Sequence, residues 1–441
     1  MPAPLMNLTT NDTYPEVADC VVIGAGIVGA CAAYWLSRAG MKVVLLEKGR
    51  VGAEQSSRNW GWCRQQNRDA RELPLSTRSL ALWEDMAQDI GVDLGFRRCG
   101  LLYLSNDAAE IEGWASWGRF ARGEGVDTRM LSASEATERG AATGQNWAGG
   151  VWSPSDGIAD PASAAPQIAR GVMQHGGVVV QGCAARGIET EAGAVSAVVT
   201  ERGVIRTPQV VMAGGAWAGS FLHQSGIFFP QASVRSSILS VAPGAEGLPP
   251  ALHTSAVSLT RRGDGGYTLA ISGKGNVDPT PRMIRKARHF LPMFTKRWRS
   301  LLPGGLQAWR AGFETMATWD LDRETPMERV RILDPRPSVA TVNQTLANAR
   351  KLLPALATVP VQARWAGYID STPDGVPVID NDIGIAGLTL AAGLSGHGFG
   401  IGPGVGHLVA DLVLARAPIT DTAQYRLARF AHSQWGSVSK F

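Results

Sequence analysis

The sequence predicts a mixed α/β fold, and three features of the 441-residue chain support this prediction. An apolar strand, a glycine-rich turn, a helix and a second apolar strand follow one another between residues 18 and 49. Alternating apolar and polar residues between 231 and 271 are typical of antiparallel strands. Further on, an apolar strand at 388–392 precedes an apolar helix that we expect to begin at Pro403.

The composition is that of a folded protein with a large core. Hydrophobic residues make up 45% of the chain and charged residues 18%, which excludes a disordered chain. The formal net charge of +4 is small and scattered, so we expect no nucleic-acid partner. The 52 glycines follow no Gly-X-Y period, which excludes collagen, and they indicate tight turns and close approaches of the backbone to a bound molecule.

The cysteines and the uncharged stretches restrict the class of protein further. The 5 cysteines are widely spaced and form no CxxC pair, so we expect reduced thiols, no metal site and a cytoplasmic location. Residues 20–37 and 383–410 lack Asp, Glu, Lys and Arg and are long enough to span a membrane. Clustered glycines interrupt both stretches, so we expect no membrane span. The first residues lack a basic region before an apolar core, so we expect no secretion signal.

A GxGxxG motif formed by Gly24, Gly26 and Gly29 lies between the first strand and the first helix. In this Rossmann-like arrangement the first glycine permits the tight turn, and the second lets the backbone approach a pyrophosphate. The third lets the helix pack closely on the sheet, and the helix N-terminus offers N–H groups to the phosphates. Glu47 ends the second strand, where a carboxylate can accept hydrogen bonds from a ribose. The motif therefore predicts a bound dinucleotide.

A second glycine-rich turn favours FAD over NAD. Between Gly393 and Gly406 the chain carries 7 glycines, directly after a predicted strand and at the start of a predicted helix. A second helix N-terminus beside such a loop suits a second electron-rich group, such as the pyrimidine end of a reduced flavin. NAD-binding domains do not require this second block.

Motifs along the chain carry a resemblance to a known family. They are GAGIVG with LLEKG near the start, AGGAW in the middle, and WAGxxxxTPDGxPxI and SGHGFGxGPGxG near the end. Together they resemble the FAD-dependent D-amino acid oxidase superfamily, in particular its bacterial D-amino acid dehydrogenase, glycine oxidase and sarcosine oxidase branch. The resemblance implies a Rossmann-like FAD-binding domain (1–92, 148–226 and 362–441) interleaved with an α+β substrate-binding domain built on an antiparallel sheet (93–147 and 227–361).

The resemblance also implies an FAD-dependent amino acid or amine oxidase or dehydrogenase. Such an enzyme oxidises the CH–N bond of a D- or N-substituted amino acid, or a related amine, to an imine by hydride transfer to flavin N5; hydrolysis then gives a keto product. Two alternatives remain open: an FAD-dependent dehydrogenase of a hydroxy acid, and the flavin-carrying subunit of a hetero-oligomeric amine or opine dehydrogenase. The electron acceptor is expected to be oxygen or quinone-linked. Substrate identity, chirality and oligomeric state are not set by the sequence.

The polar loop after the second strand is expected to reach the active site. In relatives this segment passes beside the isoalloxazine ring, and Arg64 matches an arginine that the sarcosine oxidase branch places by the flavin. Cys63, beside it, is expected to be an inert buried thiol. The residues expected to act in catalysis are Arg64, Gln66, Tyr368 and His397.

Charge is expected to govern substrate binding. Arg64 or Arg310 would hold a carboxylate, because a bidentate arginine is the usual partner of that group. Asp370 would favour a cationic amine if it faces the pocket. Gly367 stands where sarcosine oxidase relatives carry the cysteine for covalent attachment, so we expect non-covalent FAD. The residues expected to bind it are Gly24, Gly26, Ile27, Val28, Gly29, Glu47, Lys48, Ser56, Ser57, Gly214, Trp217, Gly396, His397, Gly398, Phe399 and Gly400.

Residues 282–301 are basic and aromatic and predict a surface helix. Its outer face is expected to be solvated, or else to dock an electron-accepting partner or a membrane surface. Any contact with a membrane is expected to be peripheral.

Overall fold

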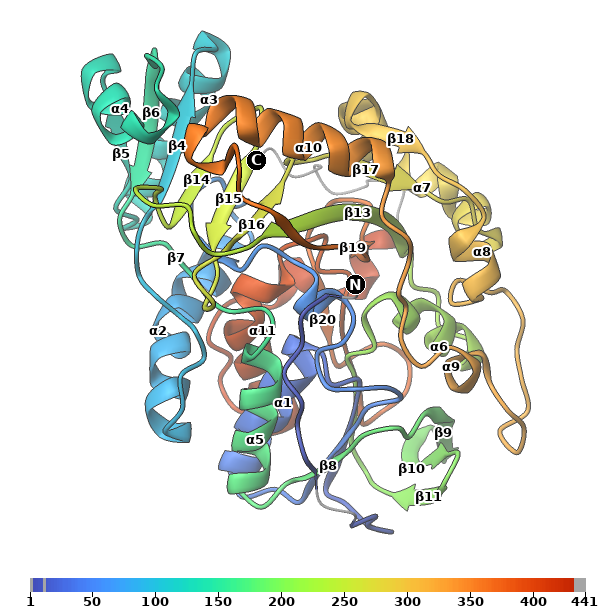
Figure 1. Ribbon diagram of the computed structural model, residues 1–441. Coiled ribbons are helices and arrows are strands. Elements are labelled where there is room, and N and C mark those ends of the chain that lie inside the picture. The colour runs from blue at the N-terminus through green and yellow to red at the C-terminus, as the bar shows by residue number, and fades with distance from the viewer. Residues whose placement is uncertain (1–2, 11–12, 432–441) are drawn as a thin grey trace.

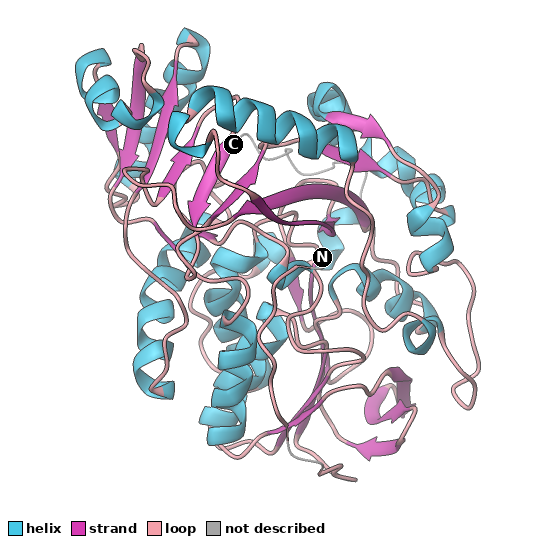
Figure 2. Ribbon diagram, viewed as in Figure 1, coloured by secondary structure: helices cyan, strands magenta, loops and turns pink. Residues whose placement is uncertain are grey.

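The computed structural model, which describes residues 3–10 and 13–431, is built around two main sheets (Figures 1 and 2). The smaller sheet has the order β20-β21-β12-β1-β2-β8, and its neighbours are parallel except β20 with β21. Every residue of β1 and β2 is buried, which explains why these strands are apolar runs rather than alternating patterns. The strands are β1 (Cys20–Ile23), β2 (Val43–Leu46), β8 (Val178–Val180), β12 (Val210–Met212), β20 (Val378–Asp380) and β21 (Leu388–Ala392).

Helices cover one face of this sheet. They are α1 (Ile27–Arg38), α2 (Leu73–Ile90), α5 (Ala164–Gln174) and α11 (Gly398–Val413). The glycines of α11 explain its close packing on α1, because a Cβ at Gly406 would lie 2.4 Å from the Cβ of Cys31. The opposite face packs against α6 (Ala218–Gln224) and a small sheet of β9 (Ala185–Glu191), β10 (Ala194–Thr200) and β11 (Gly203–Arg206).

The larger sheet has the order β18-β17-β13-β16-β15-β14-β4-β6-β5, and β19 also pairs with β13. It is antiparallel apart from the β14–β4 and β17–β18 pairs. Helix α10 (Val339–Leu352) lies across it in Figure 1 and contributes to its core. The strands are β4 (Leu101–Ser105), β5 (Arg129–Leu131), β6 (Gly149–Ser153), β13 (Ala232–Val241), β14 (Ala251–His253), β15 (Ser258–Arg261), β16 (Tyr267–Ala270), β17 (Gly275–Val277), β18 (Leu301–Pro303) and β19 (Val361–Ser371).

The remaining elements connect or flank the two sheets. A short ribbon pairs β3 (Trp62–Cys63) with β7 (Gly157–Ile158). The remaining α-helices are α3 (Ala108–Gly123), α4 (Ala133–Arg139), α7 (Pro281–Arg297), α8 (Gln307–Ala311) and α9 (Pro326–Arg329). No helix in the described ranges is long and apolar enough to span a membrane.

These sheets confirm the predicted fold class, a Rossmann-like part combined with an α+β part on an antiparallel sheet. The start of α11 was placed too late: the helix begins at Gly398, and Pro403 is its sixth residue, so one backbone hydrogen bond inside the helix is missing there. Strands β6 and β19 pair within the larger sheet, although the proposed boundaries assign 148–226 and 362–441 to the FAD-binding part. The division into two domains stays a proposal.

Candidate active site

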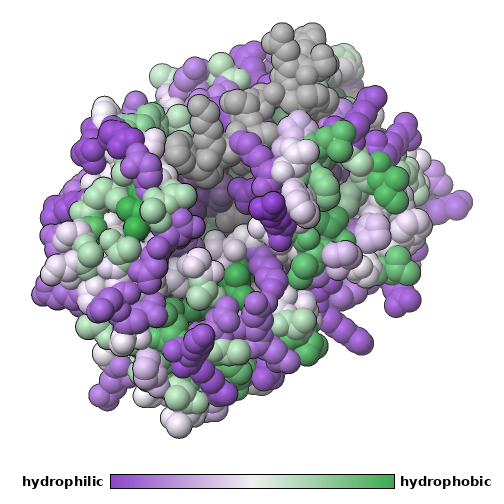
Figure 3. All heavy atoms as spheres, turned by 90° about the horizontal axis from the view of Figure 1, so that it is seen from above, coloured by the Kyte–Doolittle hydropathy of each residue, from purple (hydrophilic) through white to green (hydrophobic). Residues whose placement is uncertain are grey.

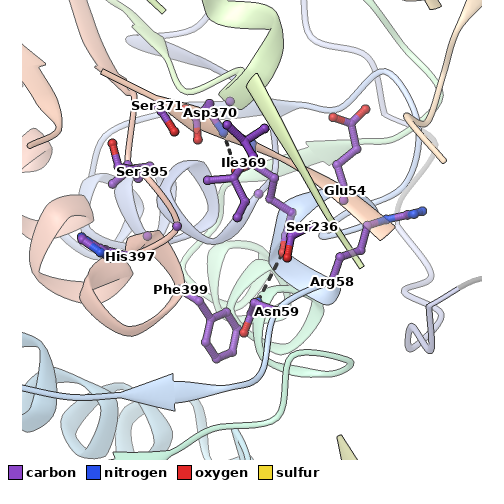
Figure 4. A pocket seen from close by; sticks show the side chains of 18 of the residues that line it. Glu54, Arg58, Asn59, Ser236, Ile369, Asp370, Ser371, Ser395, His397 and Phe399 are labelled. Atoms are coloured by element: carbon purple, nitrogen blue, oxygen red, sulfur yellow. Dashed lines mark hydrogen bonds between the residues drawn. The ribbon is translucent and has the colours of Figure 1, made fainter. Parts of the chain in front are cut away.

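A cavity of about 870 Å³ lies between the two main sheets. The carboxyl ends of β1, β2 and β12 contribute Ile23, Leu46 and Met212 to its wall. The larger sheet contributes residues of β13, β14 and β4, and Figure 4 shows part of this lining. Ligands of parallel α/β sheets bind at the carboxyl ends of the strands, so this cavity is the candidate active site.

Part of the wall is a glycine cradle formed by Gly24, Gly26 and Gly214. Gly24 has φ +97°, and a Cβ there would lie 2.6 Å from the carbonyl oxygen of Ala213. At Gly26 a Cβ would approach Ser56 Oγ to 3.2 Å, so any larger side chain would fill the cradle. The cradle lies at the N-terminus of α1, where the helix dipole favours a negatively charged group. It therefore fits the pyrophosphate of a dinucleotide.

Glu47 lies beside this cradle and fixes its turn. Its carboxylate accepts hydrogen bonds from the N–H of Ala25 (3.0 Å) and of Gly49 (2.8 Å). Burial raises the pKa of Glu47, and the nearby Lys48 ammonium opposes this rise. The ammonium of Lys48 forms an ion pair with Glu54 (2.6 Å) and lies 4.6 Å from the centre of the Trp217 ring.

The second glycine-rich turn leads from β21 to the N-terminus of α11, which also lines the cavity. Asp370 of β19 holds this turn: its carboxylate accepts hydrogen bonds from Gly393 N (2.6 Å) and Gln231 Nε2 (3.3 Å). Burial raises the pKa of Asp370 to about 6. Although Asp370 lines the cavity, its carboxylate is occupied by these hydrogen bonds, which leaves it poorly placed to bind a substrate amine.

His397 precedes α11 and lies in the same wall. Its Nδ1 is 2.9 Å from Oε2 of the fully buried Glu72. The Glu72 carboxylate can only accept a hydrogen bond, so we assign the imidazole proton of His397 to Nδ1. Burial and the Arg68 charge lower the pKa of His397 and outweigh the opposite effect of Glu72. Figure 4 shows the ring pointing away from Ile369 and Asn59.

A second group in the wall, which we call the arginine cluster, consists of Arg64, Arg68, Tyr103 and His253. The ring centres of Tyr103 and His253 lie 5.2 Å apart. Burial raises the pKa of Tyr103 to about 12, and the Arg64 charge opposes this rise. Arg68 is 3% exposed, and its Nη1 is buried without a hydrogen-bond partner. Burial lowers the pKa of Arg68 to about 10, so it remains charged at neutral pH. A buried guanidinium with an unpaired donor is a built site for an anion.

His253 and Tyr103 are the uncharged members of the arginine cluster. Burial, assisted by the Arg64 charge, lowers the pKa of His253 to about 4, so its imidazole is neutral at pH 7. The Nδ1 of His253 lies 2.9 Å from Ser258 Oγ. Trp62 packs edge-on against Tyr103, with ring centres 6.0 Å apart. These aromatic side chains make this part of the wall less polar than water, and such surroundings strengthen the interaction of an anion with the arginines.

Helix α7 closes the cavity with apolar side chains. Together with Ile238 and Val234 of β13, they give the region an apolar surface suited to a hydrophobic group. The apolar residues of α7 in this wall are Met283, Ala287, Phe290, Leu291, Met293 and Phe294; the charged Arg297 also lines the cavity.

Most residues expected to contact the cofactor line this cavity. Gly29 and Ser57 do not: a Cβ at Gly29 would collide with the carbonyl oxygen of Gly24, so this glycine serves helix packing. The expected residues that line the cavity are Gly24, Gly26, Ile27, Val28, Glu47, Lys48, Ser56, Gly214, Trp217, Gly396, His397, Gly398, Phe399 and Gly400.

Three of the residues expected in catalysis or substrate binding lie outside the cavity wall. Gln66 is fully buried, and its amide oxygen accepts a hydrogen bond from Thr128 (2.7 Å). Tyr368 donates from its hydroxyl to Asp278 (2.9 Å). Arg310 is exposed on α8. Neither hydrogen bond is directed into the cavity, so we leave these three residues out of the proposed site.

Arg68, Tyr103 and His253 are the site residues that sequence reasoning missed. Tyr103 and His253 are opposite each other in the parallel pairing of β4 with β14, and no local pattern records this pairing. Arg68 stands only four residues after Arg64 in the same polar loop, so a search for a second cation there would have found it.

Comparison with known proteins agrees with this geometry. The profile of the family described as FAD dependent oxidoreductase (DAO) matches residues 19–412. The chain is 24% identical to mitochondrial sarcosine dehydrogenase of Mus musculus. The match covers 95% of this chain but only 42% of that protein, so the chain spans less than half of this relative. It is 26% identical to sarcosine oxidase subunit beta of Rhizobium meliloti, covering 93% of this chain and 88% of that one. The solved structure of L-amino acid deaminase from Proteus myxofaciens in complex with anthranilate is 26% identical, covers 97% of both chains and has a TM-score of 0.91.

Proposed function

Because the chain belongs to the DAO family of FAD-dependent oxidoreductases, we propose that it oxidises the CH–N bond of an amino acid whose carboxylate is held by Arg64 and Arg68. The product is an imine, which water hydrolyses to a keto acid and ammonia, or to a keto acid and an amine if the substrate nitrogen carries a substituent. The observation that carries this proposal is the unpaired, buried Nη1 of Arg68 beside the Arg64 charge. Relatives named for sarcosine and L-amino acids support the class of substrate.

FAD is the cofactor of this family, and the cavity fits it. In this proposal, the glycine cradle and the N-terminus of α1 hold the pyrophosphate, and Glu47 lies where a ribose can bind. The second helix N-terminus, at Gly398 of α11, faces the flavin end. Gly367 has no side chain that can form a bond to the flavin, which supports non-covalent binding. Bound FAD supplies the acceptor for the two electrons of the CH–N bond.

The arginine cluster orients the substrate in this proposal. A carboxylate bound by Arg64 and Arg68 fixes one end of the molecule, so the CH–N bond is held in one position. Because His253 is neutral at pH 7, it does not repel a substrate amine. The apolar residues of α7 and the aromatic residues around Trp62 exclude water. His397 keeps its proton at Nδ1 on Glu72 and acts as part of the wall.

A hydroxy acid is the second candidate substrate, because the arginine cluster recognises any α-carboxylate. Such a substrate would be oxidised at CH–OH and would give a keto acid directly. Both substrates carry the carboxylate that the arginines would bind, so the experiment compares each amino acid with the corresponding hydroxy acid.

The test is anaerobic mixing of the purified protein with matched compounds while the flavin absorbance is followed. The panel contains amino acids of both configurations, N-methyl amino acids, the corresponding amides and the corresponding hydroxy acids. We expect bleaching by an amino acid, bleaching that is about 100-fold less efficient with its amide, and none with the hydroxy acid. Arg64→Ala should remove the preference for the acid over the amide, whereas Arg310→Ala should keep it. Bleaching by hydroxy acids alone would overturn the assignment of CH–N oxidation.

A further inference from the structure

The exposed large hydrophobic residues gather on one segment of the surface, which runs from α7 through β18 to α8. In the described part of the chain, the exposed members of this class comprise these residues and only Val17, Val204, Phe228 and Val339 elsewhere. Figure 3 shows hydrophobic residues on the side of the molecule that carries α7 and α8 in Figure 1. We call this surface the α7–α8 patch; its exposed apolar residues are Ile284, Leu291, Phe294, Trp298, Leu302, Leu306 and Trp309.

The same segment is strongly basic. No Asp or Glu occurs between residues 279 and 313. Two of its cations, Arg282 and Lys286, are buried and donate hydrogen bonds to the carbonyl oxygens of Gly219 and Phe229. These bonds fasten the inner face of α7 to the protein. The cations that remain exposed are Arg285, Arg288, Lys296, Arg297, Arg299 and Arg310.

The outward face of α7 has the pattern of a helix that lies in a membrane interface. Ile284 and Leu291 of α7 and Trp298, the residue directly after its end, follow one another at seven-residue spacing, with Phe294 on the same stripe. Their exposed fractions of 62%, 57%, 54% and 51% show that this stripe is turned outward. The guanidinium of Arg299 lies 5.3 Å from the centre of the Trp298 ring. Tryptophan beside arginine suits the boundary between headgroups and acyl chains.

We propose that the α7–α8 patch docks on the surface of an anionic lipid bilayer. The positive charge without any acidic residue complements anionic headgroups, and the apolar stripe supplies the insertion energy. Leu291 and Phe294 are exposed and also line the cavity, so the cavity reaches the patch. Docking therefore places this side of the cavity against the lipid. The proposal does not depend on which substrate the enzyme oxidises.

The test is flotation of the FAD-loaded protein with vesicles of phosphatidylcholine alone or mixed equally with phosphatidylglycerol. The variant Trp298→Ser/Arg299→Gln changes an exposed pair outside the cavity wall. The matched control is Val204→Ser/Arg206→Gln on β11, which lies far from α7 in Figure 1. We expect binding to the mixed vesicles at low salt, about tenfold weaker binding of the patch variant, and no change in the control. FAD content and flavin bleaching by small substrates should be equal in all three proteins.

Three results would overturn the proposal. The first is no flotation with mixed vesicles. The second is equal binding to both kinds of vesicle, because this would remove the role of anionic headgroups. The third is equal flotation of the patch variant and its parent. If the protein instead forms a dimer that the patch variant alone dissociates, and no vesicle binds, the patch is an interface between two copies of the chain.

Discussion

The glycine cradle and the arginine cluster lie in one cavity but are built in opposite ways. In the cradle, Gly24 and Gly26 act by having no side chain, so that backbone and a helix N-terminus face the ligand. In the arginine cluster, the charged side chains of Arg64 and Arg68 line the cavity, and burial together with the Arg64 charge lowers the pKa of Arg68. The cradle therefore suits a cofactor common to a whole family. The cluster suits the part of a substrate that distinguishes one enzyme from another.

The largest effect is expected from filling the cradle. Gly26→Val should abolish FAD binding, because the Cβ alone already approaches Ser56 Oγ to 3.2 Å and the two methyl groups would occupy the space for the pyrophosphate. The flavin absorbance of the purified protein measures this directly. Gly113→Val is the matched control, since a Cβ at Gly113 of α3 meets no atom within 4 Å. A yellow Gly26→Val protein with normal FAD content would contradict the role of the cradle.

The second effect concerns substrate affinity without loss of the cofactor. Arg68→Gln should lower kcat/KM for an amino acid by about 100-fold, because a buried partner of the carboxylate is lost. It should lower kcat/KM for the matching amide much less, and FAD content should stay normal. Equal losses on acid and amide would show that Arg68 supports the fold and does not bind the carboxylate.

A smaller effect is expected from the pH dependence of stability. The pKa of His253 is about 4 in the folded protein and about 6.5 in an unfolded chain, so only the unfolded chain takes up a proton between these values. The free energy of unfolding therefore falls as pH decreases from about 6.5 to about 4. His253→Asn removes this contribution, so the drop in Tm from pH 7 to pH 5 should be smaller than in the parent protein by about 2 °C. An identical drop in both proteins would show that His253 is not held neutral by its surroundings.

The smallest effect is expected at Asp370. Its carboxylate is bonded to Gly393 N and Gln231, so Asp370→Asn keeps an acceptor for the Gly393 N–H. The ratio of kcat/KM for an amino acid to that for a simple amine should change by no more than about twofold. A large gain for the acid over the amine would mean that Asp370 faces the substrate.

The same comparison explains what the sequence could and could not predict. Gly24 and the α1 N-terminus were predictable because a glycine marks a place where the local backbone conformation excludes other residues. At Gly24 this conformation is a φ of +97°. His253 was not predictable, because it reaches Tyr103 only through the pairing of β14 with β4, two strands far apart in the sequence. Gln66 shares the loop of Arg64, yet its side chain turns to Thr128, and only packing decides this orientation.

The most direct test of the central claim is a titration of the oxidised, FAD-loaded protein with benzoate and, separately, with benzamide, followed by the flavin absorbance. The two compounds have the same shape, and only benzoate carries the charge that Arg64 and Arg68 would bind. We predict a spectral shift with benzoate, binding of benzamide that is weaker by about 100-fold, and loss of this difference in Arg68→Gln at unchanged FAD content. Equal affinities for the two compounds, or an unchanged preference in Arg68→Gln, would contradict the account.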